Sequence, residues 1–151
     1  SMGHASSVAL GIALEKPERK VVALDGDSAC MMHMGAMTMV SKLDVPNFMH
    51  VVLNNGSHES VGGQPSAGHK VDFTKIAEAC DYATVGHPVT TEVELMEALE
   101  VLRNCGKASF NDCRIHKGLS RKLPPVIFDH REVIDALIDN LNESRITMDK
   151  K

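Results

Sequence analysis

Two short apolar runs, "KVVAL" (20–24) and "NFMHVVLN" (47–54), flank the segment "SACMMHMGAMTMVSKL" (28–43), which has the apolar spacing of a helix. The order strand, helix, strand, with strands that are apolar almost throughout, is typical of a parallel sheet covered on both faces. We therefore predict an α/β fold with three layers, αβα, in which helices lie on each side of a mainly parallel sheet.

The rest of the chain continues the same alternation. Helices are predicted at 5–15, 72–81, 90–106 and 130–143, and strands at 82–86 and 107–116. A polar, glycine-rich loop at 55–71 is unusually long for a compact domain unless it is functional or disordered. A chain of 151 residues fits one domain. We predict one domain over residues 1–143 and a frayed tail over 144–151.

Composition excludes several classes of function. The net charge of −4 without a basic cluster argues against a nucleic-acid partner. No apolar run approaches the roughly 20 residues of a membrane helix, so we expect no membrane partner. The four cysteines show no CxxC spacing and favour buried thiols in a reducing compartment, which predicts a cytoplasmic protein.

Polar residues follow both central strands where each strand ends. The segments "DGDSA" (25–29) and "NNGSHES" (54–60) meet at the carboxyl edge of a parallel sheet, which brings Asp27 near Asn54 or Asn55. Carboxylate and amide oxygens with few charges suit Mg²⁺, which completes its shell with phosphates and water. The alternative is two ordinary turns, since Asp-Gly and Asn-Asn-Gly are common turn sequences.

The same residues resemble a known family. "GDS" (26–28) followed by "LNN" (53–55) is similar to the Gly-Asp-Gly to Asn-Asn motif of thiamine-diphosphate enzymes, with Ser28 in place of the second glycine. The stretches "SMGHASSVALGIAL" (1–14), "LDGDSACMMHMGAM" (24–37) and "LNNGSHESVGGQPSAG" (53–68) resemble the C-terminal, pyrophosphate-binding domain of the phosphonopyruvate decarboxylase family. The first two stretches are shared more widely, including with sulfopyruvate decarboxylases, and the third is more specific.

The resemblance implies thiamine diphosphate and Mg²⁺ as cofactors. It implies Asp27 and Asn55 as side-chain ligands of the metal and the backbone carbonyl of Ser57 as a third ligand. Asn55 is preferred to Asn54 because the motif's ligand is its second asparagine. The residues implied to contact the cofactor are Met2, Gly26, Asp27, Ser28, Ala29, Asn55, Ser57 and His58. Met2 would lie beneath the bend of the cofactor, and its alternative is an initiator methionine at a cloned terminus.

The loop after Asn55 is expected to face the substrate. His58, Glu59 and Gln64 are the candidate catalytic residues, on a glycine-hinged loop that could close over the substrate and exclude water. The alternative is a solvated surface loop, in which polar residues need no special explanation.

The family's activity is the decarboxylation of phosphonopyruvate, a 2-keto acid, to phosphonoacetaldehyde and CO₂. We expect this chain to supply the pyrophosphate and Mg²⁺ half of the active site. The pyrimidine-binding domain, absent here, would come from another chain or a missing segment, and we expect a homo-oligomer. The alternatives are a sulfopyruvate decarboxylase subunit and a non-catalytic, truncated thiamine-diphosphate-binding module. A nucleotide-binding domain is disfavoured because no GxGxxG follows the first strand.

Overall fold

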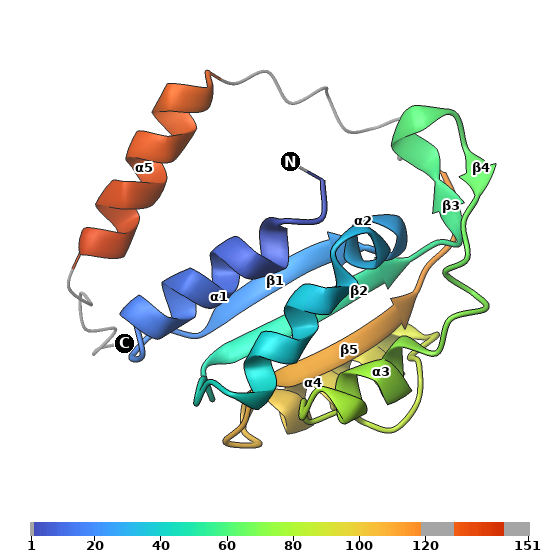
Figure 1. The fold of residues 1–151 in the computed structure, drawn as a ribbon, viewed down its shortest axis with the longest axis horizontal. Helices are drawn as coiled ribbons and strands as arrows, with labels where there is room; N and C mark the ends of the chain where they lie inside the picture. The colour runs from blue at the N-terminus through green and yellow to red at the C-terminus, as the bar shows by residue number, and fades with distance from the viewer. Residues whose placement is uncertain (1, 119–128, 144–151) are drawn as a thin grey trace. The chain divides into compact units, whose positions relative to one another are not determined.

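The computed structural model of the protein describes residues 2–118 and 129–143 (Figure 1). The chain divides into two compact units, Ser1–Gly118 and Leu119–Lys151. The first unit contains the sheet and the candidate site. The second contains helix α5, His130–Asn142. The predicted domain boundary at residue 143 stays a prediction, and the predicted tail at 144–151 lies outside the described residues.

The sheet of the first unit is parallel, as predicted. Its strands are β1 (Val21–Gly26), β2 (Phe48–Asn54) and β5 (Ser109–Arg114), in the order β1-β2-β5. Gly26 pairs with Leu53, and Asn54 pairs with Arg114, so all three strands end at the same edge. This edge is where the polar residues of the predicted site follow the strands.

One helix layer packs on the sheet face that carries Phe48, Val52 and Phe110. It consists of α1 (Ala5–Glu15), α2 (Asp27–Met32), the 3₁₀ helix η1 (Met34–Ser41) and α3 (Phe73–Ala79). The shared core lies between these helices and the sheet and includes Ala13 and Ala77.

The opposite face is covered by α4 (Glu92–Arg103), whose Ala98 and Leu102 pack on Met49 and Val51. Figure 1 shows α4 on the side of the sheet away from α1 and α2. The three-layer prediction is therefore confirmed.

Two predicted elements differ from the structure. The single helix predicted over 28–43 is broken at His33, whose φ of −133° and ψ of 38° are not helical. After the break, Thr38 and Ser41 each donate a side-chain hydrogen bond to the carbonyl three residues earlier, which accompanies the tighter 3₁₀ winding of η1.

The strand predicted at 82–86 is wrong in extent. Ala83 forms one isolated bridge to Ser109, and a second bridge joins Val89 to Cys113. Gly86, with a φ of +81°, lies between these bridges and turns the backbone out of an extended conformation.

The polar segment predicted as a loop at 55–71 contains a small antiparallel hairpin. Its strands are β3 (Ser57–His58) and β4 (Gln64–Pro65), joined by the 3₁₀ turn η2 (Glu59–Val61). Gly62 and Gly63 have positive φ angles of 117° and 76°, which closes the turn. No helix among the described residues is long and apolar enough to cross a membrane.

Candidate functional site

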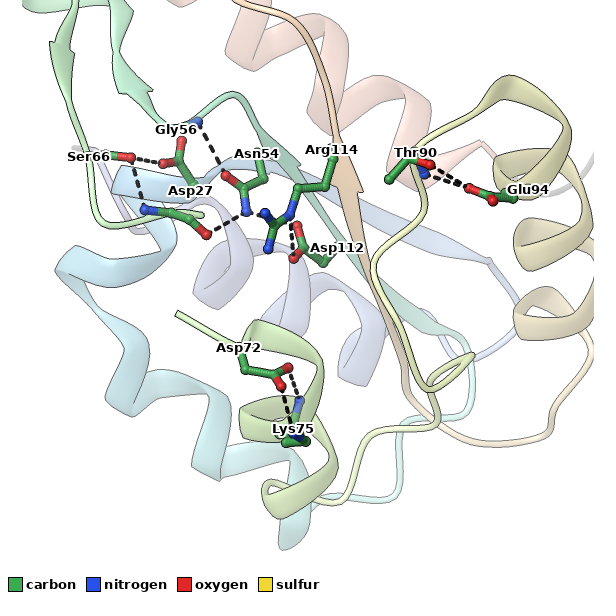
Figure 2. Close-up of polar contacts among 11 residues, drawn as sticks. Asp27, Asn54, Gly56, Ser66, Asp72, Lys75, Thr90, Glu94, Asp112 and Arg114 are labelled. Atoms are coloured by element: carbon green, nitrogen blue, oxygen red, sulfur yellow. Dashed lines mark hydrogen bonds and ion pairs between the residues drawn. The ribbon is translucent and has the colours of Figure 1, made fainter. Parts of the chain in front are cut away.

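Asp27 and Asn54 meet at the carboxyl edge of the sheet (Figure 2). Asp27 is the first residue of α2 and is 2% exposed, and Asn54 is the last residue of β2 and is fully buried. Both side chains border Gly68, where an added Cβ would lie 2.5 Å from Asn54 Oδ1 and closer still to Asp27 Oδ2. The structure therefore brings together the carboxylate and amide oxygens that the topology predicted.

The Asn54 amide is held by three hydrogen bonds. Its Nδ2 donates to the Gly68 carbonyl at 2.8 Å and to Asp112 Oδ1 at 3.1 Å, while its Oδ1 accepts the Gly56 N–H at 3.3 Å. Asp112 is buried on β5, and burial raises the pKa of its carboxyl group. Arg114 Nε lies 3.6 Å from Asp112 Oδ2 (Figure 2).

Asp112 and Arg114 were missed as site residues from the sequence, in which both lie within the strand predicted at 107–116. The signal that could have found them is their place at the carboxyl end of a strand in a parallel sheet.

The Asn55 side chain is hydrogen-bonded to the hairpin and to its own turn. Its Nδ2 donates to Glu59 Oε2 at 2.7 Å, and its Oδ1 accepts the Ser57 N–H at 3.0 Å. The second oxygen of Glu59 accepts the Gly118 N–H at 2.6 Å, so Glu59 connects the hairpin to the chain after β5. An amide oxygen has two lone pairs, so Asn55 Oδ1 retains one acceptor position for a further partner.

The oxygens at this edge have the chemistry of a magnesium site. The Ser66 hydroxyl donates to Asp27 Oδ2, and within the described residues no basic side chain forms an ion pair with Asp27. A buried carboxylate is costly without a cation. The described residues also contain no cluster of three His, Cys, Asp or Glu side chains that could hold a metal. A cation here would depend on Asp27, amide and backbone oxygens, and ligand phosphates, which suits Mg²⁺.

The first turn of α2 provides polar groups for an anion. Ser28 Oγ is buried and has no hydrogen-bond partner among the described residues. A Cβ on Gly26 would contact nothing within 4 Å, so the space next to Gly26 is open. Ser28 stands where the family motif has its second glycine. Its hydroxyl therefore offers a hydrogen-bond donor beside the open space at Gly26 and next to Ala29.

Met2 lies on the segment that packs against α2. Its side chain is 45% exposed. Its neighbour Gly3 has a φ of +86°, and a Cβ there would lie 2.7 Å from the Ala29 carbonyl and 2.5 Å from His33 Nδ1. Only glycine fits this close approach, which keeps Met2 beside the helix that carries Ser28 and Ala29.

The three candidate catalytic residues share the hairpin. His58 pairs with Gln64 across β3 and β4, and Glu59 begins the turn between them. Ser57 Oγ donates to the carbonyls of Gly63 and Gln64, at 3.1 and 3.3 Å, and so ties the base of the hairpin together. The structure brings these residues together next to Asn55, and their catalytic roles stay predictions.

Comparison with known proteins gives the family. Residues 1–113 match the family described as "Thiamine pyrophosphate enzyme, C-terminal TPP binding domain", TPP being another name for thiamine diphosphate. The chain belongs to this family. The match covers Asp27, the turn over 54–57, the hairpin and Asp112, and the resemblance found in the sequence is confirmed.

Relatives include two kinds of decarboxylase. The chain is 41% identical over 99 residues to a phosphonopyruvate decarboxylase of Streptomyces viridochromogenes, covering 66% of this chain and 24% of that protein. It is 29% identical over 143 residues to a sulfopyruvate decarboxylase subunit beta of Methanocaldococcus jannaschii, covering 87% of this chain and 71% of that subunit. The chain thus spans about a quarter of the phosphonopyruvate decarboxylase that it matches.

A solved structure shares the fold. The thiamine diphosphate-dependent 4-hydroxybenzoylformate decarboxylase of Rhodococcus jostii RHA1 superposes with a TM-score of 0.65 at 19% identity, covering 79% of this chain and 24% of that chain.

Proposed function

We propose that this chain supplies the pyrophosphate and Mg²⁺ half of the active site of a phosphonopyruvate decarboxylase. The observation that carries the proposal is the buried Asp27 carboxylate. It lies at the end of β1 without a basic partner among the described residues, beside the turn that contains Asn54, Asn55 and Ser57. The 41% identity to a phosphonopyruvate decarboxylase supports the choice of substrate.

The residues would share the work as follows. Asp27, Asn55 Oδ1 and the Ser57 carbonyl would hold Mg²⁺. Gly26, the Ser28 hydroxyl and Ala29 would contact the diphosphate. Thiamine diphosphate, when bound, supplies the electron-accepting chemistry that decarboxylation requires. The protein's own contribution is to bind the cofactor, orient it and exclude water.

The hairpin, which follows Asn55 in the chain, would contact the substrate. His58 and Gln64 are cross-strand neighbours, and such pairs present their side chains on the same face of a hairpin. We propose that these two residues and Glu59 face the 2-keto acid, with Met2 supporting the cofactor from the α2 side.

The complete reaction would need residues from outside this chain. Because the chain spans 24% of the matched phosphonopyruvate decarboxylase, we propose that a pyrimidine-binding domain in another chain or segment completes the site. We also propose that the chain forms a homo-oligomer.

A second candidate substrate is sulfopyruvate. The alignment with the Methanocaldococcus jannaschii subunit covers 71% of that subunit, whose name marks it as one of several subunits. This alignment supports a beta-type subunit of a sulfopyruvate decarboxylase as the second candidate. Turnover of phosphonopyruvate and of sulfopyruvate, measured after mixing with a pyrimidine-domain partner, distinguishes the two candidates.

The first test is calorimetric titration of the chain with thiamine diphosphate, with and without Mg²⁺. We expect binding that requires Mg²⁺ and is lost in Asp27→Ala, since removal of the carboxylate leaves the metal without its charged protein ligand. Asp44→Ala, at an exposed aspartate outside the site, is the matched control and should bind as the wild type does. Unchanged Mg²⁺-dependent affinity in Asp27→Ala would exclude this metal site.

A further inference from the structure

We infer that Asp112 is a positioning residue. It fixes the orientation of the Asn54 amide and, through Asn54, the turn over residues 54–57 that carries the proposed ligands Asn55 and Ser57. The expected effect of Asp112 on cofactor binding rests on the proposed function, because Asn55 and Ser57 belong to the proposed Mg²⁺ site. The expected effect of Asp112 on the turn over residues 54–57 can be measured in the ligand-free chain.

The hydrogen-bond partners of Asn54 determine which way its side-chain oxygen and nitrogen point. Its nitrogen faces two acceptors, the Gly68 carbonyl at 2.8 Å and Asp112 Oδ1 at 3.1 Å. Neither acceptor can pair with an amide oxygen, so the NH₂ group must point toward both of them. The oxygen is thereby turned to the opposite side, where it accepts the Gly56 N–H. Asp112 supplies one of the two acceptors that prevent the amide from flipping.

The Asn54 amide also holds the turn over residues 54–57, through Gly56. Gly56 has a φ of +65°, a conformation that favours glycine. Two side-chain acceptors hold the turn in this shape, Asn54 Oδ1 on the Gly56 N–H and Asn55 Oδ1 on the Ser57 N–H. A flipped Asn54 amide would present NH₂ to the Gly56 N–H, and two donors repel each other. The turn would then lose the contact that fixes the residue between the two proposed ligands.

The place of Asp112 on β5 suits it to hold the Asn54 amide in one orientation. Asp112 pairs with Val52 of the central strand β2, and its carbonyl accepts the Val89 N–H at 2.8 Å on the other side of β5. The residue is 1% exposed, so its backbone is held in place. Within the part of the chain that the structure describes, Asp112 forms no hydrogen bond or ion pair with Asp27, Asn55 or Ser57, so it acts through Asn54. A buried carboxylate costs stability, which an apolar residue at this position would avoid.

The test compares three variants of the full chain. Asp112→Val removes the acceptor, and Asp112→Asn keeps an acceptor oxygen without the charge. Asn111→Val is the matched control, because Asn111 is the adjacent residue on the same strand, is 2% exposed, and has an amide without hydrogen-bond partners among the described residues. Its cross-strand partner Val51 belongs to the core beneath α4, on the other face of the sheet.

Two measurements are made on each variant. NMR of the ligand-free chain follows the Asn54 side-chain NH₂ signals and the hydrogen-exchange rate of the Gly56 amide. Calorimetry follows Mg²⁺-dependent binding of thiamine diphosphate. We expect Asp112→Val to shift the Asn54 signals, to speed Gly56 exchange about tenfold and to weaken binding about tenfold, the effect of losing one hydrogen bond to a charged group. Asp112→Asn should restore both measurements to within about threefold of the wild type, and Asn111→Val should change neither.

The results separate the inference from the proposed function. Unchanged Asn54 signals and Gly56 exchange in Asp112→Val would overturn the inference, as would binding losses that are equal in Asp112→Val and Asn111→Val. If Asp112→Val does not fold, Asp112→Ser, whose side chain is too short to reach the Asn54 amide, takes its place with the same expectations. If the wild-type chain does not bind thiamine diphosphate, the proposed function fails for this chain, while Gly56 exchange still decides the role of Asp112.

Discussion

At the scale of single residues, burial beneath the candidate site controls the chemistry of Cys30. Cys30 lies on α2, next to the first turn that would contact the diphosphate, and is 4% exposed. Burial, with a smaller contribution from the nearby Asp25 carboxylate, raises the pKa of its thiol to about 12. Because the thiolate is the reactive form, this position is protected from alkylation.

We predict that iodoacetamide at pH 8 modifies the exposed Cys105 and spares Cys30 in the folded chain. The rise in the Cys30 pKa from 9.0 to about 12 lowers its thiolate fraction by about three orders of magnitude. Mass spectrometry of peptides after timed alkylation measures both sites. In denaturant both cysteines should react. Equal rates at the two sites in the folded chain would mean that α2 opens readily.

The residue scale also shows what a sequence can say about a site. Asp27 and the Asn54-Asn55 pair could be placed together because each directly follows a strand, and parallel strands end at one edge. Asp112 could not be connected to Asn54, since the two residues are separated by 58 positions and their contact depends on the register of β5. The partners of Asn55, Glu59 and the Ser57 N–H, depend on a hairpin that was predicted only as a loop.

At the scale of elements, the sequence predicts features that depend on residues only a few positions apart, such as the start of a helix. Helix α3 begins after Asp72, which accepts the Lys75 N–H at 3.0 Å, and α4 begins with a capping box formed by Thr91 and Glu94. The cap at Asp72 agrees with the helix predicted at 72–81, whereas the helix predicted at 90–106 followed from its apolar spacing. The break at His33 and the single bridge at Ala83 were missed, because both depend on how the chain packs against the sheet.

The α4 capping box predicts a pH-dependent stability. Hydrogen bonds from Thr90 and then Thr91 lower the pKa of Glu94 from its usual 4.5. A group whose pKa is lowered by folding stabilises the protein above its unfolded pKa, and this contribution is lost as the pH falls through the folded value. We therefore expect Glu94→Gln to lower Tm relative to the wild type at pH 7, and the difference to shrink as the pH falls below about 4.5.

The measurement is thermal unfolding followed by circular dichroism between pH 3 and pH 7. Thr91→Ala removes the other half of the box and should cost about 1 kcal/mol, a fall in Tm of about 2–4 °C. Glu97→Gln, on the same helix outside the cap, is the control for the loss of one negative charge. A Tm difference for Glu94→Gln that does not vary with pH would contradict the assigned ionic role of the cap.

At the scale of the whole first unit, one sheet face is covered unevenly. Helix α4 packs on β2 and β5, while Val22 and Leu24 of β1 are 50% and 64% exposed on that same face. Within the described residues β1 pairs with β2 alone, so its outer edge is unpaired. An open strand edge beside exposed apolar side chains favours association with another chain. The proposed homo-oligomer therefore has a physical basis in this surface.

We predict that Leu24→Lys weakens self-association of the chain, because a charged side chain beside an open edge opposes pairing with another strand. The mass of the particle, measured by light scattering across a range of protein concentrations, should shift toward the monomer in this variant. Val8→Lys is the matched control, since Val8 is 61% exposed on α1, which packs on the opposite face of the sheet. Equal masses for Leu24→Lys and the wild type at every concentration would show that this face of β1 does not mediate the association. A monomeric wild type would instead remove the homo-oligomer from the proposal, and the unpaired edge would then be left for the pyrimidine-binding partner.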